Sequence, residues 1–437
     1  MTKQTENTRE IALQVIIGVL EKGEYSHLML KNTLDKYGYL EKQERSFIAR
    51  LVNGTIERAI ELDYIINQFS KTKVPKMKPM IRSILRMSVY QIFYMENVPD
   101  NAACNEAVKL AKAHKFQSLS GFVNGVLRNI ARQKDEISYP DAKKDQKKYL
   151  SVKYSMPEWI VTLFLEQYKL QQVEDIFEGF LCTRPLYVRY TGTDVKSWIK
   201  ELEASKITYR KSEKLPYAYM IENVDRVELL PGYFEGDFVV QDLGSMIITD
   251  KARIKEGDCV IDVCGAPGGK ALHAASIVGE SGHISVRDLS ENKVSLIEEN
   301  IDRSGLDNIE AKVWDATVFC ESDEEKADVV IADLPCSGLG VISRKSEIKY
   351  RMSMDDIVSI SLLQRKILST IYKYVKVGGT LMYSTCTLTQ NENQDNVKWF
   401  IENFPFELQY EETLFPTGEK NVDSTDGFFM ARLVRTS

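Results

Sequence analysis

The spacing of apolar side chains changes along the chain from a helical to a strand-like period. Over residues 8–132 apolar residues recur every three or four positions, as in the run from Ile11 to Leu20, and this predicts helices throughout. Residues 133–149 lose the period and are rich in charge, so we expect a linker there. From residue 245 short apolar runs alternate with helical stretches, which is typical of a mostly parallel sheet.

The pattern and the length of 437 residues favour three domains. We expect a helical bundle over residues 1–140, a small α+β domain over residues 141–244, and an α/β domain over residues 245–437. The strands expected in the last domain are Cys259–Cys264, His283–Asp288, Glu310–Trp314, Val329–Asp333 and Thr380–Ser384, with an edge pair at Phe406–Glu411 and Phe428–Val434.

Charge is unevenly distributed between these parts. The whole chain carries a net charge of −6, whereas residues 1–140 hold 21 Lys and Arg against 15 Asp and Glu, a net charge of +6. The remainder therefore carries −12. A basic first domain joined to an acidic remainder indicates that the first domain meets a polyanion.

Composition also indicates the compartment. The first residues lack an apolar stretch of signal-peptide type, and no early apolar run is long enough to span a membrane. Seven cysteines without an export signal favour reduced thiols and a cytoplasmic protein. Four scattered histidines and the absence of a C-x-x-C pair argue against zinc. We expect a monomer with no metal and no membrane contact.

A glycine-rich turn follows the first strand of the α/β domain. Glycines let the backbone approach a ligand closely, and the helix that follows offers unpaired N–H groups. Asp288 ends the second strand, where a carboxylate suits the two ribose hydroxyls of an adenosine. Asp315 follows the third strand, where it can accept from the adenine amino group. The turn reads Cys264-Gly265-Ala266-Pro267-Gly268-Gly269-Lys270.

The turn lacks the patterns of two other nucleotide sites. It is not Gly-x-Gly-x-x-Gly, which argues against NAD. A phosphate-binding P-loop needs a glycine where Cys264 stands and a hydroxyl where Ala271 stands. We therefore expect S-adenosylmethionine as the cofactor. The alternative is a turn that serves only helix–strand packing.

Two cysteines follow two later strands in polar segments. They are Cys336, in Asp-Leu-Pro-Cys-Ser-Gly, and Cys386, in Tyr-Ser-Thr-Cys-Thr. One cysteine after a strand is usually a packing residue, but a pair in one nucleotide-binding domain indicates a thiolate nucleophile. Carbon 5 of cytosine becomes nucleophilic toward a sulfonium methyl group once a thiolate has added to carbon 6. A base must then remove the proton on carbon 5.

Other residues supply the remaining parts of this chemistry. Asp333 and Lys270 are candidates for contacts to the ring, and Cys336, or a water reached through it, is a candidate for the elimination step. Cysteines elsewhere are expected to be structural: Cys104, Cys182, Cys259 and Cys320. A basic group after Cys336 can hold RNA phosphates or form a solvated charge cluster: Arg344, Lys345, Lys349 and Arg351.

These motifs resemble those of the RNA cytosine-C5 methyltransferases of the NOL1/NOP2/Sun family (Sun/Fmu type). The resemblance implies a Rossmann-like, S-adenosylmethionine-dependent domain in which Cys386 is the nucleophile and Cys336 assists release. It implies cofactor contacts from Cys264, Gly265, Ala266, Pro267, Gly268, Gly269, Lys270, Asp288, Asp315 and Asp333. It also covers residues 236–245, the residue pair Glu392-Asn393 beyond Cys386, and Asp426-Gly427-Phe428-Phe429. Gly265 and Leu334 depart from the usual alanines.

The first 132 residues are similar to a NusB-type RNA-binding helical domain. The similarity rests on residues 47–55, 84–87, 105–111 and 121–129. A NusB-like domain joined to this catalytic half is the arrangement of the bacterial family members that act on 16S ribosomal RNA. The resemblance thus implies methylation of a cytosine in free or partly assembled 16S RNA, through a covalent Cys386–C6 adduct. The alternatives are the same reaction on transfer RNA, or a non-catalytic RNA-binding assembly factor.

Overall fold

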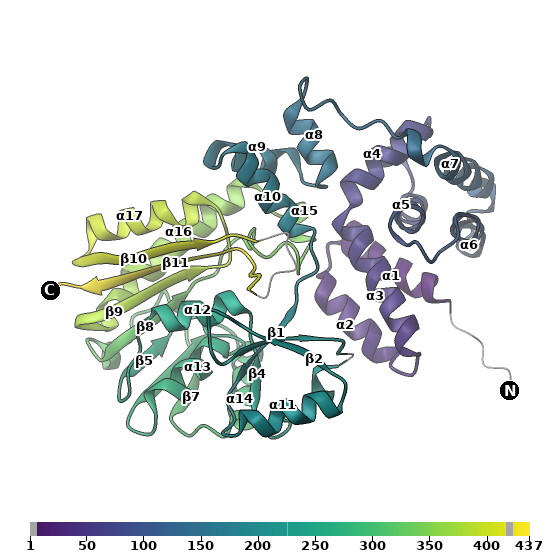
Figure 1. Cartoon of the computed structure of the whole chain (residues 1–437). Helices are drawn as coiled ribbons and strands as arrows, with labels where there is room; N and C mark the ends of the chain where they lie inside the picture. Colours follow the sequence, from purple (N-terminus) through teal and green to yellow (C-terminus); the bar gives the residue numbers. More distant parts are fainter. Residues whose placement is uncertain (1–6, 225, 417–422) are drawn as a thin grey trace. The chain divides into compact units, whose positions relative to one another are not determined.

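In this computed structural model, residues 7–224, 226–416 and 423–437 are described (Figure 1). The chain divides into two units. One, here called the helical unit, comprises the residues up to Leu181 together with Ile342–Arg351. The other, here called the sheet unit, comprises Cys182–Val341 and Met352–Ser437.

The helical unit is built around α5. Residues on every side of this helix are buried, including Ser83, Leu85 and Ser88, because α1, α3, α4, α6 and α7 all pack against it. The helices of this unit are α1 (Thr8–Lys22), α2 (Ser26–Lys36), α3 (Lys42–Glu57), α4 (Ala59–Phe69), α5 (Pro79–Tyr94), α6 (Asp100–Ala113), α7 (Ser120–Arg132), α8 (Gln146–Lys153), α9 (Glu158–Gln167), α10 (Leu170–Phe180) and α15 (Ile348–Arg351).

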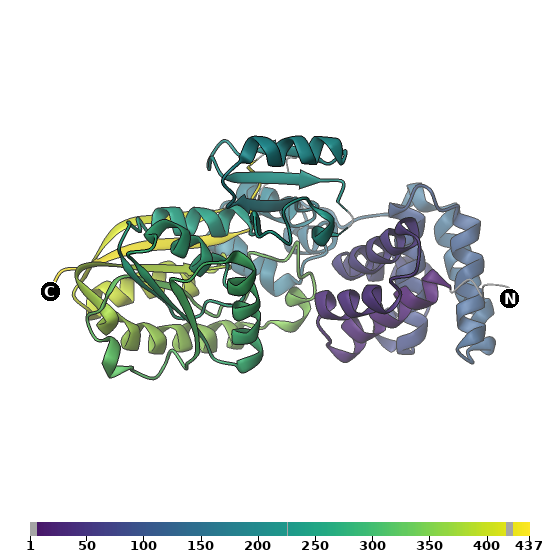
Figure 2. The ribbon, with the colours of Figure 1, turned by 90° about the horizontal axis from the view of Figure 1, so that it is seen from below.

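A four-stranded antiparallel sheet in the order β2-β3-β1-β4 opens the sheet unit. Helix α11 packs on this sheet through Trp198 and Leu202, which join a core with Val188, Tyr219 and Phe238. Figure 2 shows α11 in teal on one side of these strands. The elements are β1 (Leu186–Tyr190), α11 (Val195–Ala204), β2 (Thr208–Lys211), β3 (Ala218–Glu222) and β4 (Phe238–Val240).

A seven-stranded mixed sheet in the order β10-β11-β9-β8-β5-β6-β7 forms the rest of the unit. Strands β5 to β9 are parallel, whereas β11 and β10 run antiparallel at one edge. The elements are α12 (Leu243–Lys251), β5 (Cys259–Asp262), α13 (Gly269–Val278), β6 (His283–Asp288), α14 (Glu291–Ser304), β7 (Ile309–Val313), β8 (Ala327–Asp333), α16 (Met354–Ile371), β9 (Val375–Thr385), α17 (Gln394–Asn403), β10 (Phe406–Leu414) and β11 (Phe428–Arg435).

Both faces of the large sheet are covered by helices (Figure 1). Side chains alternate along a strand, so Val329 and Ile331 of β8 face the core shared with α12, α13 and α14. Val330 and Ala332 face the opposite core, shared with α16 and α17. Burial on both faces explains why these strands read as continuous apolar runs in the sequence.

Strand β5 lies between β6 and β8, so the strand order reverses beside it. Open α/β sheets bind ligands at the carboxyl ends of strands next to such a reversal. The ends of β5 and β8 are Asp262 and Asp333. The fold therefore places the glycine turn and the Cys336 segment at one edge of the sheet.

The predicted elements differ from the structure mainly in their limits. The strand expected to reach Cys264 ends at Asp262, because the backbone turns there. Helix α16 ends at Ile371, and Val375 begins β9. Residues 133–149, expected to be a linker, contain the start of α8 at Gln146, where Asp145 caps the helix. The edge pair at the end of the chain forms as expected.

Candidate active site

A tight turn joins β5 to α13. Gly268 has a φ of 105°, which favours glycine. A Cβ atom added to Gly265 would lie 2.3 Å from the side chain of Val286 and 3.0 Å from the carboxyl group of Asp262. The Gly265 N–H donates to the carbonyl of Arg287 at 2.8 Å. Glycines are thus required by the path of the backbone, which lies against β6.

A cavity of about 190 Å³ lies at this turn. The turn and Lys270 line one part of it, and Gln241, Asp242 and Ser245, which follow β4, line another. Asp262 and Asp333 complete the lining. The cavity is therefore built by the ends of β5 and β8 together with the start of α12.

Asp262 is fully buried in this lining. Neither of its carboxylate oxygens has a hydrogen-bond partner among the described residues. Burial raises its pKa to about 7, although the neighbouring Lys270 ammonium opposes the rise. A buried carboxylate without partners is costly, and a ligand with ammonium or hydroxyl donors would satisfy it. S-adenosylmethionine carries both kinds of donor, so the residues present fit this cofactor.

Asp288 and Asp315 occupy different environments. Asp288 is buried and accepts from the N–H groups of Ala266 at 3.2 Å and Leu289 at 2.8 Å, so it is tied to the turn. Asp315 is exposed and accepts from the N–H and the hydroxyl of Thr317, both at 2.8 Å. The backbone bond from Thr317 is the main reason why the pKa of Asp315 is lowered. Neither carboxylate lines the cavity.

Lys270 and Asp333 form an ion pair beside the cavity. The Lys270 Nζ lies 2.6 Å from Oδ2 of Asp333, and the hydroxyl of Ser384 donates to the other carboxylate oxygen at 2.8 Å. Burial opposes the charge of Lys270, but Asp333 and Asp262 outweigh it, and the pKa of Lys270 is raised. The site therefore holds one fixed positive charge between two acidic strand ends.

The two cysteines meet beyond β8 and β9. The register of these parallel strands pairs Asp333 with Ser384, so the segments that follow leave the sheet side by side (Figure 1). The Sγ atoms of Cys336 and Cys386 lie 2.9 Å apart. This contact is the main reason why the pKa of Cys336 lies well above its ordinary value, and burial adds to it. Cys336 therefore holds its proton beside the sulfur of Cys386.

Glu392 holds the two cysteine segments together. Its buried carboxylate accepts from the N–H of Ser337 at 2.8 Å, from the hydroxyl of Ser337 at 2.6 Å and from the hydroxyl of Thr389 at 2.6 Å. The hydroxyl groups of Ser337 and Thr387 lie 2.8 Å apart. Residues next to Cys336 and Cys386 thus share one hydrogen-bond network, and burial raises the pKa of Glu392 within it.

A second link between the segments is made by backbone groups. The N–H of Gly340 donates to the carbonyl of Cys386 at 3.0 Å, and the N–H of Gly427 donates to the carbonyl of Gly340 at 2.8 Å. A Cβ atom added to Gly340 would lie 2.1 Å from the carbonyl oxygen of Gly427. The motif near the end of the chain that begins at Asp426 therefore belongs to the same site.

The structure brings most of the predicted site residues together. Cys264 to Pro267, Gly269, Lys270 and Asp333 line the cavity, and Asp288 reaches it through Ala266. Cys264 is not a second nucleophile candidate, because burial and the nearby Asp262 raise its pKa. Sequence reasoning gave no role to Asp262. Its signal, an aspartate at the end of an apolar strand, is also that of an ordinary strand end.

One expectation for the basic group after Cys336 is wrong. Lys349 is buried in the helical unit and donates to the carbonyl of Glu57 at 2.6 Å, so it is neither free to hold a phosphate nor solvated. Arg344 and Lys345 are exposed. Among the described residues, no group of three or more His, Cys, Asp or Glu is placed to bind a metal. None of the helices in the described ranges has the length and hydropathy needed to cross a membrane.

Comparison with known proteins decides the family. The model of the family described as 16S rRNA methyltransferase RsmB/F matches residues 252–434, and that of the NusB family matches residues 6–132. The probable ribosomal RNA small subunit methyltransferase B of Bacillus subtilis (strain 168) is 36% identical over 409 residues, which cover 91% of this chain and 89% of that protein. The chain belongs to the RsmB/F family of 16S rRNA methyltransferases. Ribosomal RNA small subunit methyltransferase B of Escherichia coli O1:K1 / APEC is 29% identical over 442 residues, covering 99% and 100% of the two chains.

Solved structures share the fold of this RsmB/F family member. The crystal structure of PH0851 has a TM-score of 0.80 at 23% identity and covers 98% of both chains. The structure of NSun6 from Pyrococcus horikoshii with SFG has a TM-score of 0.57 at 21% identity, covering 64% of this chain and 97% of that one.

Membership of the RsmB/F family confirms several predictions made from the sequence. The protein is an S-adenosylmethionine-dependent ribosomal RNA methyltransferase, with a NusB-type helical domain followed by a Rossmann-like catalytic domain. Its substrate is therefore an RNA. The predicted family is also confirmed.

Proposed function

We propose that this RsmB/F family member methylates carbon 5 of a cytosine in 16S ribosomal RNA through a covalent bond between Cys386 Sγ and carbon 6 of the ring. The observation that supports this most directly is the pair of sulfur atoms 2.9 Å apart. Such a reaction needs one thiolate to attack and a second group to assist its departure. The assignment of attack to Cys386 and of release to Cys336 follows the family resemblance.

The first step forms the bond from Cys386 Sγ to carbon 6. The electron pair of the 5,6 double bond moves into the ring toward N3, where negative charge grows. Lys270 is held in its charged form beside Asp333, so it can stabilise that charge. Asp333 can accept from the exocyclic amino group of the cytosine. These two residues are therefore the proposed contacts to the ring.

The second half of the reaction restores the enzyme. S-adenosylmethionine, when bound, supplies an electrophilic methyl carbon to carbon 5. A base then takes the proton from carbon 5 while the bond from carbon 6 to Sγ breaks and its electron pair returns to Cys386. Because Cys336 holds its own proton, we propose that it donates a hydrogen bond to the departing sulfur. The base that accepts the proton from carbon 5 is proposed to be a water reached through Cys336.

The cofactor is proposed to lie in the cavity at the glycine turn. Residues 264–270 would hold it together with Asp262 and Asp333, while Asp288 fixes the turn through Ala266. Asp315 is proposed as a contact to the adenine because of its place after β7. The unsatisfied carboxylate of Asp262 is the observation on which the fit rests.

Incorporation of a tritiated methyl group into undermethylated 30S RNA tests the role of Cys386. Cys386→Ala and Cys386→Ser are expected to lose at least about a thousandfold in rate, as for loss of a covalent nucleophile. Cys320→Ser is the matched control, because Cys320 lies outside the cavity lining and contacts Ser322. Unchanged incorporation by Cys386→Ala would remove this residue from the mechanism.

We propose further that the substrate is free or partly assembled small-subunit RNA and that the enzyme acts as a monomer in the cytoplasm. A base must be unpaired or extruded to reach thiols at a strand end, which favours RNA that is not yet fully packed. Tritium incorporation should be compared on naked 16S RNA, mature 30S subunits and transfer RNA. Incorporation into transfer RNA alone would contradict the proposal. Bisulfite sequencing of the product then identifies the cytosine.

A further inference from the structure

Residues 342–351 belong to the helical unit although they are far from its other residues in sequence. The chain leaves the sheet unit after Val341 and returns to it at Met352. Just before this segment, the N–H of Gly340 donates to the carbonyl of Cys386 at 3.0 Å. One residue separates Gly340 from Ile342. The residue that donates to Cys386 therefore lies only two positions before the first residue that packs in the helical unit.

Glu347 binds the start of a helix in that unit. Its carboxylate is buried and accepts from the N–H of Ser26 at 3.0 Å and from the hydroxyl of Ser26 at 2.6 Å. Ser26 is the first residue of α2, whose preceding residue Tyr25 gives no side-chain cap. A carboxylate at a helix N-terminus satisfies unpaired N–H groups and complements the helix dipole.

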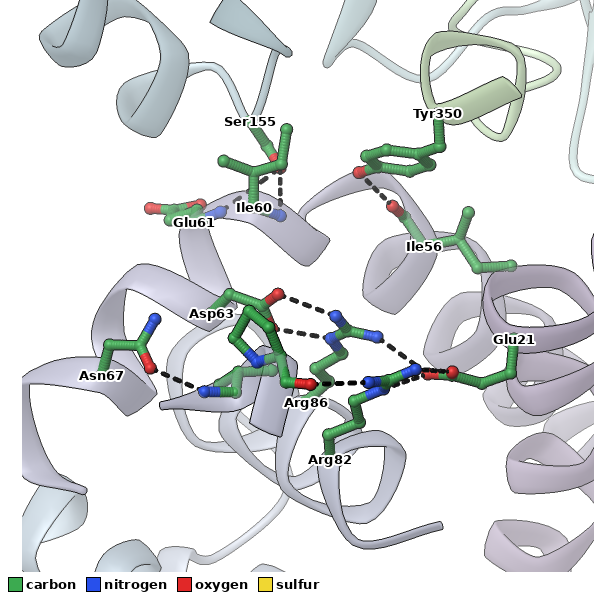
Figure 3. Close-up of polar contacts among 12 residues, drawn as sticks. Glu21, Ile56, Ile60, Glu61, Asp63, Asn67, Arg82, Arg86, Ser155 and Tyr350 are labelled. Carbon is green, nitrogen blue, oxygen red and sulfur yellow. Dashed lines mark hydrogen bonds and ion pairs between the residues drawn. The ribbon is translucent and has the colours of Figure 1, made fainter. Parts of the chain in front are cut away.

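Lys349 and Tyr350 bind the end of another helix. The Nζ of Lys349 donates to the carbonyl of Glu57 at 2.6 Å. The hydroxyl of Tyr350 donates to the carbonyl of Ile56 at 2.8 Å, as Figure 3 shows. Both carbonyls belong to the last turn of α3, which ends without a glycine cap. A cation and a hydroxyl there satisfy unpaired carbonyl groups, and the cation complements the dipole.

The surroundings of Tyr350 are themselves fixed by polar contacts. Figure 3 shows Ser155, whose hydroxyl accepts from the N–H of Ile60 at 3.0 Å at the start of α4. The same view shows Asp63 of α4 paired through both oxygens with Arg86 of α5, at 2.7 Å each. The segment therefore docks against helices whose own positions are set by ion pairs and caps.

Docking of the segment is specific because it places a negative charge and a positive charge at opposite kinds of helix end. Glu347 lies at the N-terminus of α2, and Lys349 lies at the C-terminus of α3. If these two residues were exchanged, each charge would face the end of a helix dipole that repels it. Lys349 is buried, and burial lowers its pKa to about 7 although Glu57 opposes the change. Burial of such groups without partners is costly, so the docked arrangement that satisfies them is favoured.

We infer that the helical unit anchors residues 342–351 and thereby positions the loop that carries Cys336. Glu347, Lys349 and Tyr350 are positioning residues for the reaction, acting through residues 337–341. The inference rests on the proposed function only for its kinetic consequence. The helical unit then has a role in catalysis that is separate from any contact with RNA.

Hydrogen–deuterium exchange of the full-length protein tests the anchoring. Tyr350→Phe removes only a hydroxyl, and Glu347→Gln is a second variant that removes the charge and one of the two oxygens that accept from Ser26. Tyr94→Phe is the matched control, because its hydroxyl donates to Glu61 within the same unit. We expect faster exchange in residues 342–351 and in residues 334–341 for both variants, by about three- to tenfold, as for loss of one buried hydrogen bond. The control should leave both peptides unchanged.

Methyl-transfer kinetics of the same variants test the consequence. A fall in kcat without a change in KM for S-adenosylmethionine is expected for Tyr350→Phe, again by about three- to tenfold. Faster exchange in 342–351 with an unchanged peptide 334–341 and an unchanged kcat would overturn the inference. Activity retained by Cys386→Ala would instead overturn the proposed function, and the exchange of peptide 334–341 would still decide the anchoring.

Discussion

The sulfur atoms of Cys336 and Cys386 lie 2.9 Å apart, although 50 residues separate them in the chain. They meet because β8 and β9 are adjacent parallel strands whose register pairs Asp333 with Ser384. Glu392 then joins the residues beyond each cysteine. The two groups that the proposed reaction uses one after the other are thus held at contact distance, and such preorganisation limits the cost of reaching a transition state.

Replacement of Cys336 by Ala is expected to trap the covalent intermediate. The departing sulfur of Cys386 then lacks its hydrogen-bond donor, so elimination slows while attack continues. A protein–RNA band that survives denaturing electrophoresis is the expected result. The double variant Cys336→Ala/Cys386→Ala should show no such band. Absence of the band in the single variant, with normal cofactor binding, would count against a role for Cys336 in release.

Glu392→Gln is expected to weaken both stability and catalysis. The carboxylate accepts three short hydrogen bonds in a buried site, whereas an amide has a single acceptor oxygen. Loss of about 2–4 kcal/mol in the free energy of unfolding is expected from the donors left unpaired. Thermal unfolding measures the loss, with Glu407→Gln, exposed on β10, as the control. A variant as stable as the wild type would show that the network contributes little.

Gly340→Ala is expected to distort the site. The added Cβ atom would meet the carbonyl oxygens of Gly427 at 2.1 Å and Cys386 at 2.8 Å, and neither is a flexible group. A destabilisation of about 1–3 kcal/mol or more is expected, with a larger loss of kcat. Gly121→Ala in α7 is the opposite case, since nothing lies within 4 Å of its added Cβ atom. That variant should be stabilised by about 0.5–1 kcal/mol.

Stability should fall with rising pH because of Asp262. Its pKa is about 7 in the folded protein, above the ordinary value of 3.8, because of burial. The protonated form is therefore favoured by folding, and the associated stability is present in full below about pH 4 and is lost as the pH rises to about 7. The difference amounts to roughly 4 kcal/mol.

Urea unfolding of the wild type and of Asp262→Asn at pH 5 and pH 8 measures this effect. As the pH rises, the free energy of unfolding of the wild type should fall relative to that of the variant. S-adenosylhomocysteine carries an ammonium group that favours the ionised carboxylate. It should therefore raise the free energy of unfolding of the wild type at pH 8 more than that of the variant. If the difference in free energy of unfolding between the two proteins is the same at both pH values, folding does not raise the pKa of Asp262.

The sequence predicts much of this fold because its local signals are strong. Short apolar runs predict the bounds of β6 and β11 to within about one residue. The glycine turn predicts a close approach of the backbone. The sequence does not predict α12, because Leu243–Lys251 is buried on several sides and lacks a polar stripe. It likewise could not show that Lys349 is buried, since that depends on helix ends almost 300 residues away in the chain. Long-range capping leaves no local pattern.

The insertion of residues 342–351 into the helical unit affects how this architecture can be divided or recombined. A fragment that begins at Cys182 would carry Glu347 and Lys349 into water without the helix ends that they bind. A chimera that takes its first half from a relative must also take these ten residues from that relative. Otherwise the contacts between this segment and the helix ends are lost. The two halves are therefore expected to be inherited as a single unit of selection rather than exchanged as independent modules.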